Sequence, residues 1–165
     1  MSDFLHHLRY HRWATARTLE SVRPLTADEL ARNLDASFGG VYGTLTHIYQ
    51  ADKIWFDRLM ERPTGNLAAY EPPAELGALE KDWDLLYGRY ISWAEGLSET
   101  DWRRVIAYRD TKGNAYQNPV WQMVVHVVNH GSYHRGQVVS LLRQLGHKPV
   151  GTDLITYYRE TAAAG

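Results

Sequence analysis

Apolar residues recur every three or four positions over four long stretches of the chain. This spacing places them on one face of an α-helix. We predict helices from a cap at Ser2 or Asp3 to about Val22, from Val41 to about Glu61, from Ala74 to about Leu97, and from Asn118 to Leu145. In the last of these, Asn118 is the expected N-cap, Pro119 the first helical residue and Gly146 the stop signal. Four long amphipathic helices in 165 residues predict an all-α fold, a four-helix bundle.

The segments between these helices carry shorter patterns. Thr26 to Glu29 predicts a capped turn of helix, because a threonine oxygen and early carboxylates complement exposed N–H groups. Leu67 to Pro73 is expected to be loop, and residues 105–108 and 115–117 predict a small β-hairpin before the last long helix. A terminal helix is expected to begin at Thr152 and Asp153. Since no repeat or linker is evident, we expect residues 1–165 to form a single domain.

Composition narrows the classes of partner. The chain has 18 Lys and Arg against 19 Asp and Glu and no basic run, so nucleic acid is not an expected partner. No apolar run approaches eighteen residues and no leader pattern is present, so we expect a soluble cytoplasmic protein without a membrane partner. The absence of cysteine excludes disulfides, thiolate ligands and a protein thiol nucleophile. Eight His, six Trp and eleven Tyr suit an aromatic pocket, and equally a core.

The most informative chemistry lies in the last long helix. His130 and His134 are four residues apart, so on a helix both imidazoles can reach one divalent metal ion. At about 100° per residue, His134 falls near the centre of the apolar face, His130 on its shoulder and His126 toward the polar side. Hydrogen-bonded core histidines are the simpler alternative. The spacing matches the zinc-protease helix His-Glu-x-x-His, but Gly131 replaces the glutamate base, which disfavours peptidase activity.

A catalytic metal usually has three protein ligands and one open position. His47 is the best candidate for the third ligand, because it lies on the flank of the apolar stripe of the second long helix. His7 and His11 also stand four residues apart and compete for this role. An exposed polar face beside Arg9 and Arg12 explains that second pair more simply.

Four further side chains are candidates for the surroundings of such a site. Asp52 falls within the apolar stripe around His47, and a buried carboxylate needs a partner. That partner is a Trp or Tyr in the structural interpretation, which we favour slightly, or the second nitrogen of a ligating histidine. Gln137 and Tyr133 are further candidates for the pocket. Arg135 is either a contact between helices or an anchor for an anionic substrate.

Residues 10–14, residues 43–55, the hairpin before Pro119 and residues 126–137 together resemble the DinB-like family of metal-binding helical bundles. This family also includes thiol-dependent transferases and isomerases. The resemblance implies a four-helix bundle and a three-histidine site at His47, His130 and His134, with nickel, zinc or iron as occupants. Many relatives have Asn where this chain has His11 and Thr15.

These features predict a metal-dependent transferase or hydrolase with a small-molecule substrate. The resemblance makes addition of a low-molecular-weight thiol to an electrophile the first expectation, and metal-assisted hydrolysis is the second. The alternative is a non-catalytic, metal-stabilised bundle for stress response or protein interaction. Its site would be closed by a fourth ligand such as His126 or His11, because structural zinc sites normally have four. We expect a homodimer in either case.

Overall fold

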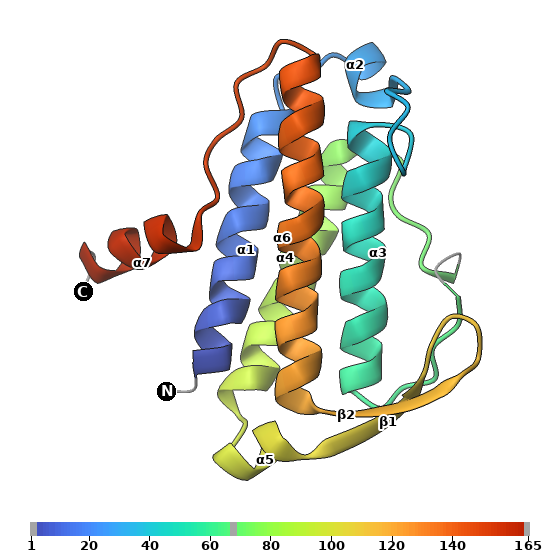
Figure 1. The fold of residues 1–165 in the computed structure, drawn as a ribbon, viewed down its shortest axis with the longest axis vertical. Helices are drawn as coiled ribbons and strands as arrows, with labels where there is room; N and C mark the ends of the chain where they lie inside the picture. Colours follow the sequence, from blue (N-terminus) through green and yellow to red (C-terminus); the bar gives the residue numbers. More distant parts are fainter. Residues whose placement is uncertain (1–2, 67–68, 164–165) are drawn as a thin grey trace.

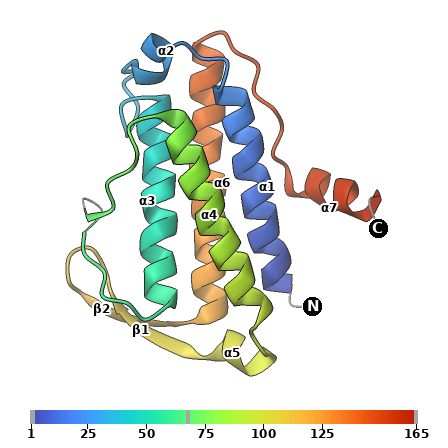
Figure 2. The same cartoon turned by 180° about the vertical axis from the view of Figure 1, so that it is seen from behind.

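A computed structural model describes residues 3–66 and 69–163, which are mainly helical with one small antiparallel sheet. Its four long helices are α1 (Asp3–Val22), α3 (Val41–Leu59), α4 (Leu76–Glu95) and α6 (Val120–Gln144). They lie side by side, with α6 between α1 and α3 and with α4 on the opposite side (Figures 1 and 2). The predicted helical fold with a hairpin is therefore confirmed. Ser2 and Leu67, where a cap and a loop were expected, lie outside the described residues.

The shorter elements are α2 (Ala27–Ala31), α5 (Glu99–Arg103), β1 (Val105–Arg109), β2 (Ala115–Pro119) and α7 (Leu154–Ala163). A capping box between Thr26 and Glu29 begins α2, as the sequence predicts. The two strands form the expected hairpin, with Tyr108 opposite Tyr116, and β2 leads directly into α6 below the end of α3 (Figure 1). The hairpin therefore crosses the end of the helices where α3 and α6 meet.

Two details of the prediction are wrong. Helix α5 was not expected, although Ser98 and Asp101 form a capping box like that of α2. Asn118 is not the N-cap of α6, because it pairs with Ile106 in the sheet and Pro119 takes the cap position. Strand pairing holds both residues in extended backbone, so the helix begins only at Val120.

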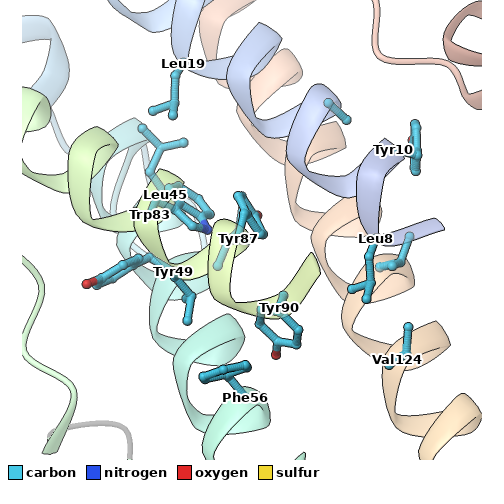
Figure 3. Close-up of a cluster of buried hydrophobic side chains, with 14 of the residues drawn as sticks. Leu8, Tyr10, Leu19, Leu45, Tyr49, Phe56, Trp83, Tyr87, Tyr90 and Val124 are labelled. Atoms are coloured by element: carbon cyan, nitrogen blue, oxygen red, sulfur yellow. The ribbon is translucent and has the colours of Figure 1, made fainter. Parts of the chain in front are cut away.

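The apolar faces of the four long helices meet in one core. Buried side chains from all of them contribute, including Leu8 of α1, Leu45 of α3, Trp83 of α4 and Val124 of α6 (Figure 3). Trp83 is 1% exposed, so the core encloses a complete indole ring. Burying such faces stabilises each helix more than its intrinsic propensity does. Of the helices in the described residues, none has the length and apolar character needed to cross a membrane.

Candidate metal centre

Three histidines meet at the seam between α3 and α6. His47 comes from α3, while His130 and His134 come from consecutive turns of α6. Each offers one ring nitrogen, and these nitrogens lie within 4.8 Å of one another. The Nε2 atoms of His47 and His130 are 3.2 Å apart. His134 is buried, and the other two rings are partly exposed. The structure thus brings together the three histidines singled out from the sequence.

The donor set suits a first-row divalent metal. Nitrogen ligands about 2.0–2.1 Å from a tetrahedral ion are separated by about 3.3 Å, close to the spacing of His47 and His130. Nδ1 of His134 donates a hydrogen bond of 2.7 Å to the Oε1 atom of Gln137. This bond places the proton on Nδ1 and leaves Nε2 of His134 with a free lone pair. Gln137, which the sequence offered as a candidate for the pocket, therefore lies against the three histidines.

Burial favours the uncharged imidazoles that metal ligation requires. It lowers the pKa of His47 to about 4, with a further contribution from the neighbouring His134. Burial likewise lowers the pKa of His130 to about 3, and His134 adds to the effect. Protonated imidazoles this close together would repel one another and a metal cation, whereas neutral rings offer lone pairs to the metal. At neutral pH His47 and His130 can therefore act as ligands without first losing a proton.

Sequence reasoning missed Phe38, which lies in the loop before α3. Its ring stacks on His47 with centroids 3.8 Å apart and planes inclined by 14°, and its edge meets His134. A Cβ atom on Gly43 would lie 1.9 Å from the Phe38 carbonyl oxygen, so only glycine lets the loop approach this closely. Gly40 meets the Arg32 carbonyl in the same way. The glycines that follow Phe38 in the sequence were the available signal that this loop packs closely.

Asp52 forms a buried network behind the three histidines. Its Oδ2 accepts hydrogen bonds of 2.8 Å from Trp83 and from Tyr87, and both carboxylate oxygens lie 3.2 Å from Nε2 of His11. Burial acts to raise the pKa of Asp52, but His11, Trp83 and Tyr87 together outweigh it and hold the pKa below its usual value. The Asp52 carboxylate is therefore bonded to a Trp and a Tyr, as in the structural interpretation. None of its hydrogen bonds among the described residues goes to His47, His130 or His134.

His11 is not on an exposed polar face, and that interpretation is wrong for this residue. It is completely buried, and Arg135 donates a hydrogen bond of 2.9 Å to its Nδ1. Nε2 therefore carries the proton and donates to Asp52, so His11 is neutral; burial lowers its pKa accordingly. Both nitrogens are occupied, so His11 cannot serve as a fourth metal ligand. A Cβ on Gly131 would lie 2.1 Å from the His11 ring, which explains the glycine between the two α6 ligands.

Three further residues considered in the sequence analysis lie around the three histidines without joining them. Arg135 is 1% exposed and donates to His11 of α1, so it is a contact between helices rather than an anchor for substrate. Tyr133 is 67% exposed, with its ring against the edge of His134. His126 is exposed and packs on Trp55, with its ring centroid 6.0 Å from that of His130. Within the described residues, the ligand group contains no fourth member.

Comparisons with known proteins place the chain in a family. A sequence model of the DinB family matches residues 1–163. The chain belongs to the DinB family. Protein DinB of Bacillus subtilis (strain 168) is 26% identical in an alignment of 165 residues that covers 95% of each chain. The crystal structure of a DinB-like protein from Bacillus cereus ATCC 10987 has a TM-score of 0.65 at 20% identity, covering 90% of this chain and 94% of that one. This likeness shows a shared fold alone. Membership of the DinB family, which the sequence motifs led us to expect, is therefore confirmed.

Proposed function

We propose that this DinB family member is a metal-dependent enzyme in which His47, His130 and His134 hold one divalent cation. The observation that carries the proposal is the convergence of three ring nitrogens, from two different helices, within 4.8 Å. Zinc, nickel and iron all accept imidazole ligands, and the donor set does not select among them. With three protein ligands, one coordination position remains for a small-molecule substrate.

The cation supplies Lewis acidity when bound: it lowers the pKa of a coordinated water or thiol and so generates a nucleophile. The chain has no cysteine, so a sulfur nucleophile has to arrive as a low-molecular-weight thiol cosubstrate. We propose addition of this thiol to an electrophile as the reaction, in which an S–C bond forms, the S–H bond breaks and its proton ends on the product. Metal-assisted hydrolysis is the second candidate. Gln137 orients His134 through the bond to Nδ1, and Phe38 shields one face of His47 from water.

The scaffold suits this use. We interpret the four long helices as a four-helix bundle that forms one domain over residues 1–165, and a homodimer as its assembly. Ligands from antiparallel α3 and α6 are then fixed by helix packing rather than by a loop. The alternative, a non-catalytic metal-stabilised module, requires a closed site. It is less well supported, because His11 is engaged elsewhere and His126 packs against Trp55.

Metal content of purified variants tests the proposal. Protein prepared without a histidine tag is loaded with zinc, dialysed and analysed for bound metal. We expect about one zinc per chain in the unmodified protein and less than about a tenth of that in His47→Ala and His134→Ala, because two ligands hold zinc poorly. His126→Ala is the matched control, since it removes a neighbouring imidazole outside the group. Full zinc retention by both ligand variants would contradict the three-histidine site.

A further inference from the structure

A cleft of about 380 Å³ lies between the end of α3 and the β-hairpin. The C-terminal turn of α3 lies directly above the hairpin in Figure 1. Three of its lining side chains are the arginines Arg58, Arg62 and Arg109, whereas Glu61 is the single carboxylate among the described lining residues. The cleft is therefore positively charged, although the chain as a whole has a net charge of −1.

The other charged groups of the cleft have protein partners. Glu61 accepts a hydrogen bond of 2.5 Å from Arg104, so it does not neutralise the arginines of the cleft. Arg62 is paired with Asp57 at 3.2 Å. Arg109 donates to the carbonyl oxygen of Gly113 at 2.7 Å. Among the described lining residues, Arg58 is the charged group that remains to be accounted for.

Arg58 is 6% exposed, and among the described residues no carboxylate lies within 4.0 Å of it. Its guanidinium lies over the rings of Trp55, at 4.5 Å, and Tyr108, at 5.1 Å, while its Nε has no hydrogen-bond partner in the part of the chain that the structure describes. An arginine keeps its proton even when burial lowers its pKa, and Asp110 acts on this charge only from a distance. The charge therefore stays buried with no carboxylate in contact among the described residues. Aromatic contacts on the planar group leave its N–H groups for a ligand, which is the geometry that suits bidentate binding of an oxyanion.

We infer that this cleft is a binding subsite for a carboxylate or phosphate group, with Arg58 as its anchor. The anion is one end of an elongated small molecule whose other end reaches the three histidines; this second part rests on the proposed function. Aromatic rings connect the two places, since Trp55 packs on His126 and His126 lies beside His130. Arg58 follows His47 by eleven residues on α3, which is about 16 Å of helix at 1.5 Å per residue. A thiol whose acidic group lies about 16 Å from its sulfur would span this distance.

The first test uses metal-free protein and follows the indole N–H resonance of Trp55, assigned with Trp55→Phe. Inorganic phosphate and acetate are titrated separately at constant ionic strength, and their separate responses distinguish a phosphate from a carboxylate site. We expect a saturable shift with at least one of them and binding at least tenfold weaker in Arg58→Gln. Arg17→Gln is the matched control, because Arg17 also lies over an indole, that of Trp13, but is paired with Glu160. No saturable shift with either anion, or undiminished binding in Arg58→Gln of unchanged helicity, would overturn the subsite.

The second test addresses the link to the metal centre. With zinc-loaded protein, a linear thiol whose terminal carboxylate lies about 16 Å from its sulfur should bind at least tenfold more tightly than its amide-capped form, measured by calorimetry. Arg58→Gln should remove this preference. Equal binding of the two forms to the unmodified protein would overturn the link. His134→Ala separates the two proposals: it should lose zinc and retain the anion-dependent Trp55 shift, so failure of the metal site leaves the subsite testable.

Discussion

Gln137 shows how a single side chain can tune the candidate site. Its Oε1 accepts the Nδ1 proton of His134 at 2.7 Å and so decides which ring nitrogen faces His47 and His130. We expect Gln137→Leu to weaken zinc binding about 10- to 100-fold, which is the usual effect of losing such a support for a ligating histidine. Competition with a chromophoric chelator measures this affinity.

Gln137→Glu retains an acceptor at the same position and is therefore the control, with affinity at least equal to that of the unmodified protein. If the Gln137→Leu and Gln137→Glu variants bind zinc equally well, the hydrogen bond to His134 has no role in zinc binding. The position of Gln137 was predictable because helix geometry places residues three apart on one face. Phe38 was not, since nothing in helical periodicity relates a loop residue to His47.

At the scale of an element, α6 combines metal ligands on its seam with α3 and a buried network on its seam with α1. Gly131 makes both possible, because the His11 ring occupies the space that a Cβ would fill. Gly136 lies on the same helix, is exposed, and has nothing within 4 Å of a Cβ position. Two glycines of one helix therefore have opposite packing environments, which a sequence pattern does not distinguish.

This contrast predicts opposite effects of the same substitution. Gly136→Ala should stabilise the protein by about 0.5–1 kcal/mol, since alanine is the better helix former. Gly131→Ala should destabilise it by about 1–3 kcal/mol despite the same propensity gain, because the new methyl group displaces His11 from Arg135 and Asp52. Thermal unfolding monitored by circular dichroism checks both, with about 2–4 °C expected per kcal/mol. A higher melting temperature for Gly131→Ala would mean that the His11 network is easily rearranged.

Across the whole molecule, local patterns predicted the helices well and the polar interior poorly. The helix boundaries follow from apolar periodicity and from Pro and Gly, and the ends of α1 and α3 match to within two residues. His11 was misplaced because its neighbours in sequence, Arg9 and Arg12, are polar, whereas its environment is set by Asp52 and Arg135 from other helices. A buried polar network is a property of packing between helices, and one helix at a time does not reveal it.

Removal of the metal distinguishes an enzyme from a metal-stabilised module at this same scale. The four long helices bury their apolar faces against one another, and the three histidines lie on the seam between only two of them. We therefore expect metal-free protein to keep its far-ultraviolet helical signal at 25 °C. Its melting temperature should fall by about 10 °C, because a ligand at 1,000 times its Kd contributes about 4 kcal/mol. His134→Ala should show no such dependence on zinc. Loss of helix on chelation would instead favour the structural role, since the binding energy would then be folding energy.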